Sequence, residues 1–462
     1  MSKSLNWTLD QLKQELKGRS AVKGWILTRE NVQRRERYFM MDGRAMVIDQ
    51  DREVHAQNIH ARIMVNIPGK PGRQGEIAKK LFPAMPLAAQ IDSAIESALQ
   101  TDHQAWELPS SVPSDLPQLK TADPRMAEDL EGCVGEISRR IEKSVMQPRE
   151  TAFNSAELFM SVHNAEAHLS NGLVHRSSQS RIYSEAAYSY ARKGAQGELQ
   201  SDEYMSTLWS VSMDDMPVEK LFDETSHRAR HSLDTVKPQT GRYSVIVDAE
   251  VLAMLFHNQL GQLSSNNSYH GLPFVKPGDE LVPGNTEAGG DAINITLDPL
   301  LDFGGDTVAI SEQGIAQGIL KLVDRNRVVA TSTDKRYSDY LGTPPTTTRG
   351  NIVVDAGRLS YEELTKGSPR VLEILQFSGL FADPNTGTYS SEIRLAKLYD
   401  NATGKVTFIK GGSLSGSFKE DFRGVRFCRE RIKRAHFSSS GGTGEGYFGP
   451  THALLSNVSI VG

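Results

Sequence analysis

The sequence predicts an α+β protein of two domains, a mixed α/β N-terminal domain and a β-rich C-terminal domain. Three observations support this fold class. Amphipathic helical patterns are concentrated in the first half, strand-like runs separated by Gly- and Pro-rich loops fill the second half, and the overall composition is that of an ordinary soluble protein. The chain of 462 residues is long enough for two or three compact units. We place the N-terminal domain at residues 1–225 and the C-terminal domain at residues 235–462.

Charge, hydropathy and cysteine content limit the class of protein further. With 52 basic and 57 acidic residues, the net charge of −5 does not favour a nucleic-acid partner or an acidic membrane surface. No uncharged stretch approaches the roughly 18 apolar residues of a membrane-spanning helix, and the N-terminal segment lacks the pattern of a secretory signal. Cys133 and Cys428 lie too far apart to form a paired-cysteine metal motif. We therefore expect a cytoplasmic protein without membrane association.

Helical and strand-like patterns alternate in the first half. Apolar residues recur at helical spacing from Gln74 to Gln100, and Pro83 and Pro86 interrupt this run, which predicts two consecutive helices. The other predicted elements are a helix at 9–16, a strand at 22–28, a hairpin at 34–49, a strand at 58–66, a helix at 125–144, strands over 152–191 with turns at His163–Asn164 and Asn171–Gly172, a strand at 203–212 and a helix at 217–232.

Strands and loops dominate the second half. Gly and Pro are dense from Pro273 to Gly305, which predicts a long irregular excursion over the surface. A short helix is predicted to begin at residues 360–364. The predicted strands are 243–247, 310–323, 328–333, 350–354, 367–378, 390–398 and 406–409.

The helix predicted at Asp248–Gln262 carries the chemically most informative residues of the chain. Asp248 is placed to cap its first free N–H groups, and an apolar stripe follows at helical spacing. A zinc peptidase helix needs imidazoles to hold the metal and a carboxylate to take a proton from the bound water. Here His257 is followed by the amides Asn258 and Gln262. The simplest interpretation of His257 alone is a partly buried structural histidine, and contact with a partner or peptide is the alternative.

Several stretches, in the same order along the chain, resemble segments of one known family. They are Phe153–Glu157 with Ser170–Gly172, Val245–Tyr269, Asn385–Ser390, and Gly411–Ser417 followed by a C-terminal strand pattern at Leu454–Gly462. Together they resemble the TldD/PmbA family, also called the modulator-of-DNA-gyrase family, and in particular its PmbA or TldE branch. No residue of the chain supports the link to gyrase in that name.

The resemblance implies positions for the family's zinc motif. In active members of the TldD branch the motif is His-Glu-x-x-x-His, and its three positions fall on His257, Asn258 and Gln262. An amide has no basicity near neutral pH, and its carbonyl oxygen is a poor zinc ligand. The family's third ligand is a cysteine that falls near 437–439, where this chain has none, and Cys428 lies about ten residues too early. The resemblance therefore implies no catalytic residue and no zinc in this chain.

By the same resemblance, the chain is expected to be a non-catalytic TldE-like subunit. Such subunits pair with a TldD-like metallopeptidase that carries the zinc, and the pairs trim leader segments from modified peptides or degrade small unfolded proteins. A homodimer is also possible. The segment with Thr386, Gly387 and Tyr389 is similar to the family's Thr-Gly-Asp-Tyr/Phe-Ser sequence. We expect these three residues, together with His257, to contact the peptide substrate or the partner.

Two other functions remain open from the sequence. The first is an active metallopeptidase with a rearranged site that recruits His257, Cys428 or the pair His227 and His231, which share one helical face at i, i+4. The second is a stand-alone binding or scaffold protein with neither metal nor peptidase partner.

Three further patterns have simple interpretations. The basic residues between Arg423 and Arg434 are expected to form a solvated face that pairs with acidic neighbours rather than a phosphate site. The glycines from Gly441 to Gly446 lack a following Gly-Lys-Ser/Thr and are expected to form a flexible loop. The alternating residues from Glu392 to Lys397 would suit pairing with an extended peptide if they formed an edge strand.

Overall fold

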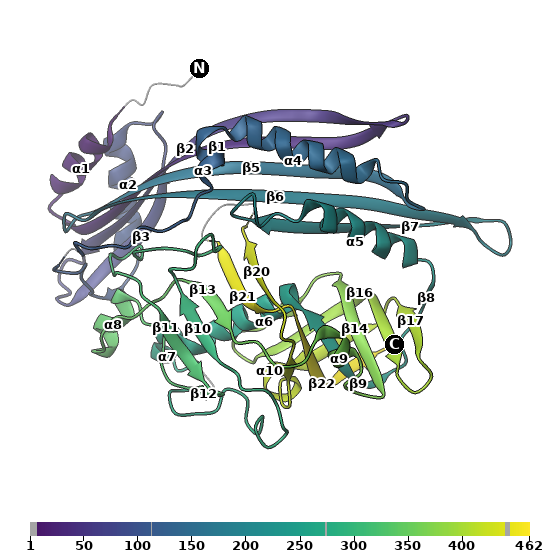
Figure 1. Ribbon diagram of the computed structural model, residues 1–462. Helices are drawn as coiled ribbons and strands as arrows, with labels where there is room; N and C mark the ends of the chain where they lie inside the picture. The colour runs from purple at the N-terminus through teal and green to yellow at the C-terminus, as the bar shows by residue number, and fades with distance from the viewer. Residues whose placement is uncertain (1–6, 112, 273–274, 439–443) are drawn as a thin grey trace.

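The computed structural model describes residues 7–111, 113–272, 275–438 and 444–462 (Figure 1). Helices and strands are mixed throughout, and the second half is rich in strands, so the predicted fold class is confirmed. A long twisted sheet from the first half lies above two sheets from the second half, whose strands are mostly shorter (Figure 1). None of the helices in the described ranges is both long enough and apolar enough to cross a membrane.

The first half of the chain builds a seven-stranded antiparallel sheet. Its strand order is β4-β3-β2-β1-β5-β6-β7, with each strand antiparallel to its neighbours. The strands are β1 (Val22–Asp42), β2 (Ala45–Asn66), β3 (Arg73–Leu81), β4 (His103–Gln104), β5 (Ala152–Leu169), β6 (Val174–Lys193) and β7 (Leu199–Ser210).

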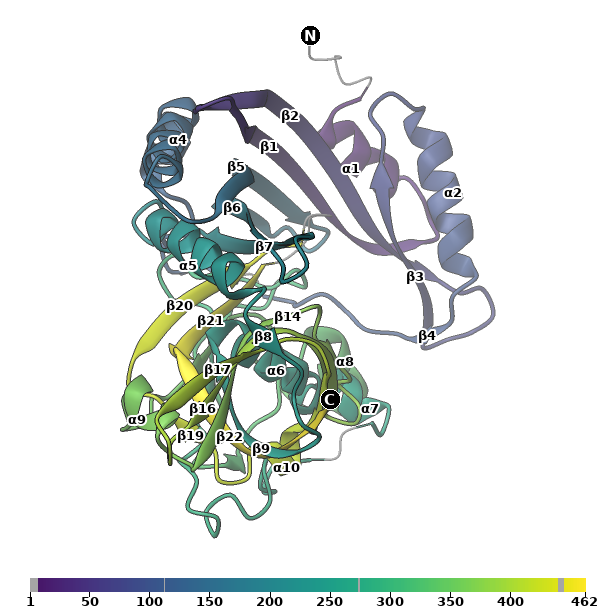
Figure 2. The same cartoon turned by 90° about the vertical axis from the view of Figure 1, so that its right-hand side faces the viewer.

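The two faces of this sheet have different partners because side chains alternate along each strand. On one face, Leu27 and Phe39 of β1 are buried in clusters formed with the helices. On the opposite face, Ile26 packs in a cluster with Ile310 and Tyr340 of the second half. The helices of the first half are α1 (Leu9–Lys17), α2 (Leu87–Leu99), α3 (Pro124–Glu128), α4 (Leu130–Val145) and α5 (Val218–His231), and Figure 2 shows α4 and α5 side by side.

The prediction of two helices between Gln74 and Gln100 is wrong for the first of them. Residues 73–81 form β3, which pairs along β2 with Ile77 opposite Ile63. Apolar residues at Ile77 and Leu81 are four apart, so their spacing fits a strand face as well as a helix face. The second prediction is confirmed by α2, which begins directly after Pro86.

Other boundaries differ because long strands continue through residues that favour turns. The residues His163 and Asn164 lie inside β5, where the ring of His163 contacts Glu30 Oε1 at 2.9 Å. The strands predicted at 22–28 and 34–49 belong to one hairpin of β1 and β2. The helix predicted at 125–144 is divided at Asp129, which caps α4.

The second half forms two sheets. A six-stranded sheet has the order β12-β11-β10-β13-β21-β20, and a nine-stranded sheet has the path β14-β9-β22-β18-β16-β17-β8. An additional pairing of β14 with β16 closes five strands of the larger sheet into a ring. The strands are β8 (Thr235–Val236), β9 (Gly241–Asp248), β10 (Ile295–Asp298), β11 (Leu320–Asp324), β12 (Arg327–Val328), β13 (Asn351–Val354), β14 (Arg370–Phe377), β15 (Phe381–Ala382), β16 (Thr388–Asp400), β17 (Lys405–Ile409), β18 (Ser413–Ser417), β19 (Arg426–Phe427), β20 (Arg431–His436), β21 (Glu445–Pro450) and β22 (His452–Val461).

The helices of the second half are short, except for α6 at its centre. Most of the predicted strands exist, but the strand predicted at 310–323 is limited to residues 320–324, and 328–333 contributes only the end of β12. The helices are α6 (Ala249–Leu260), α7 (Ser265–Tyr269), α8 (Lys335–Leu341), α9 (Tyr361–Thr365) and α10 (Phe418–Asp421), with a 3₁₀ turn at Gly261–Leu263 after α6.

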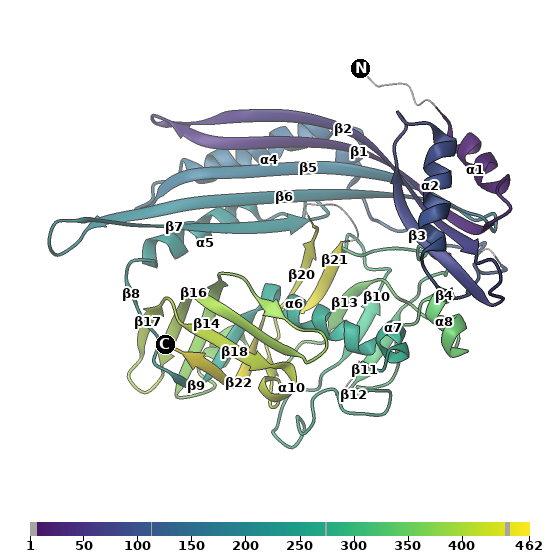
Figure 3. The ribbon, with the colours of Figure 1, turned by 180° about the vertical axis from the view of Figure 1, so that it is seen from behind.

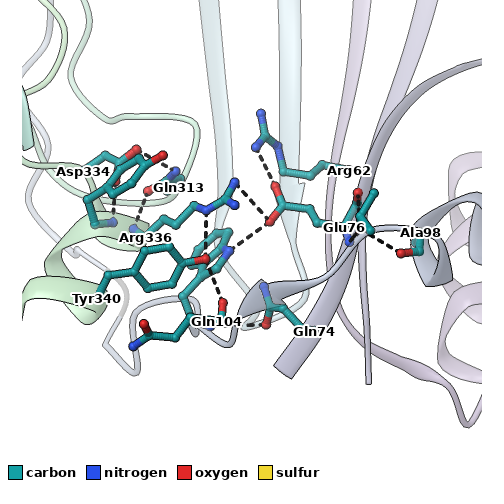
Figure 4. Close-up of polar contacts among 12 residues, drawn as sticks. Arg62, Gln74, Glu76, Ala98, Gln104, Gln313, Asp334, Arg336 and Tyr340 are labelled. Atoms are coloured by element: carbon teal, nitrogen blue, oxygen red, sulfur yellow. Dashed lines mark hydrogen bonds and ion pairs between the residues drawn. The ribbon is translucent and has the colours of Figure 1, made fainter. Parts of the chain in front are cut away.

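A buried carboxylate, Glu76 of β3, marks one contact between the two halves (Figure 4). Its side chain accepts hydrogen bonds from Trp106 Nε1 at 2.9 Å and Arg62 Nη1 at 2.8 Å. Arg336 of α8 lies with its Nη1 atom 3.8 Å from Glu76 Oε2, and its Nε donates to the hydroxyl of Tyr340 at 3.0 Å. The Tyr340 hydroxyl in turn donates to a backbone carbonyl of β4 at 2.7 Å. These bonds hold α8 against the end of the long sheet.

Candidate functional site

Helix α6 lies between the two sheets of the second half and begins where β9 ends (Figure 1). The Asp248 carboxylate accepts hydrogen bonds from two backbone N–H groups of the first turn, both at 3.1 Å, as the sequence predicts. Phe256 is buried and packs edge-on against Phe418 and Phe422, with ring centroids 5.8 and 5.7 Å apart. This packing fixes the rotation of the helix and therefore the direction of the residues that follow Phe256.

His257 lies partly buried on α6, and its Nε2 atom has no hydrogen-bond partner among the described residues. Burial lowers the pKa of the imidazole, although the charges of Glu445 and Asp306 and a hydrogen bond to the backbone of Gly446 oppose this shift. The ring is therefore held neutral. A neutral, partly buried ring fits the structural interpretation, while the unpaired Nε2 leaves a contact with a partner or peptide as a prediction.

Asn258 and Gln262 hold the polypeptide segment that connects β15 to β16. The Nδ2 atom of Asn258 donates to the carbonyl oxygen of Ala382 at 3.0 Å, and Nε2 of Gln262 donates to the carbonyl oxygen of Pro384. An ionised carboxylate has no proton to donate to a carbonyl oxygen, so the amide at position 258 suits this contact and a glutamate would not. The two motif positions thus serve as donors to backbone, which is a structural task.

The donor atoms present do not fit a zinc ion. Within the described ranges, no group of three His, Cys, Asp or Glu side chains is arranged to hold a metal. Phe437, near the expected position of the family's cysteine, is buried with its ring centroid 5.6 Å from that of Trp209, and Ser439 lies outside the described residues. Cys428 is fully buried, with its sulfur 3.0 Å from the hydroxyl oxygen of Thr451.

His227 and His231 share one face of α5, with ring centroids 4.6 Å apart. His231 stacks on Phe408 of β17 at 4.2 Å with nearly parallel planes, and burial lowers the pKa of both imidazoles. The pair therefore packs the first half of the chain against the second. In the described part of the chain no third ligand joins the two rings.

The segment that contains the other predicted contact residues, Thr386 and Gly387, forms a tight turn next to α6. The Asp383 carboxylate accepts hydrogen bonds from the backbone N–H of Asn385 at 2.8 Å and from the Thr386 hydroxyl at 2.9 Å. Gly387 has a φ of +70°, a conformation that disfavours residues with a Cβ atom. The structure thus brings Thr386 and Gly387 into the segment held by Asn258 and Gln262.

Tyr389 lies beyond this turn with its hydroxyl directed at a buried carboxylate. The hydroxyl donates to Oδ2 of Asp421 at 2.7 Å, and the backbone N–H of Ser417 donates to the same oxygen at 2.8 Å. Burial and the neighbouring Asp421 charge raise the pKa of Tyr389 well above its usual value. Burial also raises the pKa of Asp421, to about 6.

Tyr389 and Asp421 line a groove of about 850 Å³ beside the closed ring of strands. Its walls come from β9, β15, β16, β18, α10 and β22, and Figure 3 labels all of these elements except β15. The side chain of Phe381 stands at the edge of the groove and is 77% exposed. The sequence predicts a contact role for Tyr389 but not for Asp421 or Phe381, because neither belongs to a motif and their proximity arises from strand pairing and packing.

The remaining sequence patterns have structural roles. Of the basic cluster, Arg426 pairs with Asp291 at 3.2 Å, Arg429 with Glu430 at 3.1 Å and Lys433 with Asp215 at 2.5 Å. This agrees with the prediction of a face that pairs with acidic neighbours. Strand β16 pairs on both of its sides, so its residues 392–397 do not form an edge strand. Gly441 and Gly442 lie outside the described residues, whereas Gly446 belongs to β21 and pairs with Ala435, so the predicted loop is wrong for its last residues.

Comparison with known proteins finds a matching family model and a relative of known family. Residues 240–462 match the family model described as the PmbA/TldA metallopeptidase C-terminal domain. The chain is 26% identical over 154 residues to a zinc metalloprotease TldD homolog of Saccharolobus solfataricus. That match covers 32% of each chain, so it spans about a third of the relative's length.

Solved structures with the same fold cover almost the whole chain. A putative modulator of DNA gyrase from Bacteroides thetaiotaomicron has a TM-score of 0.74 at 16% identity, with 98% of each chain covered. TldE from Thermococcus kodakarensis has a TM-score of 0.75 at 13% identity, covering 98% of this chain and 99% of that one. A putative modulator of a DNA gyrase from Thermotoga maritima has a TM-score of 0.71 at 16% identity, covering 98% of this chain and 100% of that one.

Proposed function

Because the chain belongs to the TldD/PmbA family, which is related to metallopeptidases, we propose that it is a non-catalytic, TldE-like subunit of a zinc peptidase complex. Its partner is a TldD-like chain that carries the zinc and cuts the peptide. The complex works in the cytoplasm, where it trims leader peptides or degrades small unfolded proteins. This chain helps to enclose and orient the extended peptide substrate.

The observation that carries the proposal is the pair of amides on α6. By the sequence resemblance, Asn258 and Gln262 fall on the positions of the family's base and second imidazole, and in the structure both donate hydrogen bonds to the backbone of residues 382–384. An amide cannot accept a proton from a water molecule near neutral pH. Their contacts therefore support a role in folding the peptide-facing segment, with the zinc chemistry left to the partner.

Metal analysis of the purified chain tests the proposal, first alone and then mixed with a TldD-like chain from the same source. We expect less than stoichiometric zinc and no peptide cleavage for this chain alone. The mixture should co-elute as one complex, hold zinc and cleave unfolded peptides. Stoichiometric zinc together with cleavage by this chain alone would instead support the active peptidase with a rearranged site.

The His257→Ala variant separates these two functions. A rearranged site that uses the imidazole loses its activity with the variant, whereas a complex whose zinc belongs to the partner keeps most of it. The matched control is His270→Ala, because His270 is an exposed histidine that follows α7. Equal activity of complexes with either variant supports the non-catalytic role. If no TldD-like chain binds, the stand-alone scaffold function gains support.

A further inference from the structure

Asp421 in the groove beside Tyr389 is a buried carboxylate that is only half satisfied. The side chain is 2% exposed, and both of its hydrogen bonds, from Tyr389 and Ser417, reach Oδ2. No described residue donates a hydrogen bond to the second oxygen, Oδ1, which keeps some contact with solvent. The charge of Arg242 acts on Asp421 and opposes the rise of its pKa, but within the described residues no nitrogen of Lys, Arg or His forms an ion pair with the carboxylate.

The carboxylate is less hydrated than an exposed one, and its two hydrogen bonds and the charge of Arg242 compensate for this only in part. Buried charges in folded proteins are normally paired, because an ionised group loses its hydration and needs compensation. Burial raises the pKa of Asp421 to about 6, so the group is still mostly ionised at neutral pH. An incoming cation would supply both the missing charge and a donor for the second oxygen.

The charged residues around the groove also favour a cation. Asp383 and Glu420 are exposed carboxylates on its lining, in addition to Asp421. Among the lining residues Arg242 carries the one positive charge, and its Nη1 atom donates to the backbone oxygen of Asn457 at 2.9 Å. The lining therefore holds three carboxylates and one guanidinium group.

A close approach of backbone and side chains keeps the buried carboxylate at this place. A Cβ atom on Gly416 would lie 1.9 Å from Oδ2 of Asp421 and 2.7 Å from the hydroxyl oxygen of Tyr389. A larger residue at position 416 would therefore displace the carboxylate and its hydroxyl donor. The glycine allows the Tyr389–Asp421 pair to reach the floor of the groove.

The apolar wall suits the stem of a long basic side chain. Phe381 is 77% exposed, and Leu380 and Ala382 beside it are partly buried. The methylene groups of Lys or Arg pack on apolar surface while the charged head reaches a polar partner. An aromatic ring next to the cation adds a further attraction.

We propose that this groove binds a Lys or Arg side chain of an extended peptide, with the cationic head at Asp421 and the stem against Phe381. The choice of a peptide as the ligand rests on the proposed function, whereas the preference for a basic side chain rests on the groove itself. The chain thereby contributes sequence selectivity that its motif helix does not supply.

Peptide titration of the full-length chain alone tests this inference. The probes are dye-labelled pentapeptides with blocked ends and the sequence Ala-Ser-Xaa-Ser-Ala, where Xaa is Lys, Arg, norleucine or Glu. Fluorescence anisotropy should give about tenfold tighter binding of the Lys and Arg peptides than of the norleucine peptide, the value of one hydrogen-bonded charge pair. The Glu peptide should bind weakest because the groove carries excess negative charge.

Two variants assign the preference to the groove. Asp421→Asn retains an acceptor for Tyr389 and Ser417 but removes the charge, so the Lys and norleucine peptides should bind equally. Phe381→Ala changes an exposed side chain and should leave the melting temperature unchanged while weakening Lys and Arg binding about threefold. Glu392→Gln removes an exposed carboxylate of β16 outside the groove and is the matched control, with the wild-type preference expected.

Three results would overturn the inference: equal binding of the Lys and norleucine peptides to the wild type, no binding of either up to millimolar concentration, or a preference that survives Asp421→Asn. Assembly with a zinc-carrying partner is measured separately by co-elution. If the chain assembles with its partner but shows no preference for basic peptides, only the inference about the groove is rejected. If the chain prefers basic peptides but does not assemble, the subunit function is rejected and the inference about the groove stands.

Discussion

The polar side chains on the motif helix and in the groove differ in how completely their hydrogen bonds are satisfied. Asn258 and Gln262 are matched to theirs, because each amide nitrogen donates to a backbone carbonyl that needs a donor. Asp421 is matched only in part, because both of its hydrogen bonds from described residues reach one carboxylate oxygen, while the other keeps contact with solvent. Matched polar groups stabilise a fold, whereas a mismatched buried group lowers its stability until a ligand binds.

The mismatch at Asp421 gives a testable dependence of stability on pH. Its pKa is about 6 in the fold, above the usual value of 3.8, so the folded chain holds this proton more tightly than the unfolded chain. The associated stability is fully present below about pH 4 and is lost as the pH rises through 6. Asp421→Asn should therefore be more stable than the wild type at pH 8, by about 2–3 kcal/mol, and nearly equal to it at pH 4.

Denaturant unfolding at pH 4, 6 and 8 measures this difference. The control is Glu392→Gln, an exposed carboxylate whose substitution should give the same small difference at all three values. A constant gap between wild type and Asp421→Asn would contradict the raised pKa.

Many helices and strands could be predicted from the sequence. These are the elements whose apolar spacing and capping residues favour the same structure as their tertiary contacts. The cap at Asp248, the helix that follows it and the strand before it are confirmed. The strand β3 was predicted as a helix, because two apolar residues four positions apart fit both periods and only pairing with β2 decides between them. Asp421 could not be found, since strand pairing brings α10 to Tyr389 from more than thirty residues away.

The turn between β15 and β16 joins the motif helix to the groove, and its glycine is the element to test. Gly387 is buried with a φ of +70°, so Gly387→Ala should destabilise the fold by about 1 kcal/mol. Gly379→Ala is the matched control, because Gly379 has no positive φ and its Cβ would meet open space. Thermal melting of both variants gives the comparison. Equal melting temperatures would show that the turn adopts another conformation.

At the scale of the whole molecule, the two halves are joined by side chains as well as by the connecting chain. Helix α5 packs on the long sheet and also meets β16 and β17 through Leu395 and Phe408, which belong to its apolar cluster. At the other end of the sheet, Glu76 collects the donors Trp106 and Arg62 with Arg336 nearby (Figure 4). Two separated contacts of different chemistry therefore hold the long sheet over the second half.

The contacts of Glu76 predict that a conservative substitution at this position strongly lowers the free energy of unfolding. Glu76→Gln keeps the size of the side chain but leaves Arg62 and Arg336 without the buried charge, so we expect a loss of about 2–4 kcal/mol. The control is Glu312→Gln, because Glu312 is 61% exposed and lies 3.7 Å from the same Arg62. Its substitution should cost less than about 1 kcal/mol. Thermal unfolding compares the two, and equal losses would mean that Glu76 does not join the halves.

The closed ring of strands also has a consequence for the order in which the chain is made. Strand β9 is an early part of the ring, yet one of its two neighbours is β22, about two hundred residues further along. A ribosome releases β9 and its apolar residues Val245, Ile246 and Val247 long before β22 exists to cover them. Pairings between such distant segments form slowly. The apolar residues of β9 therefore lack this strand partner during synthesis until β22 has been made, and the pairing of β22 with β9 is needed to complete the ring.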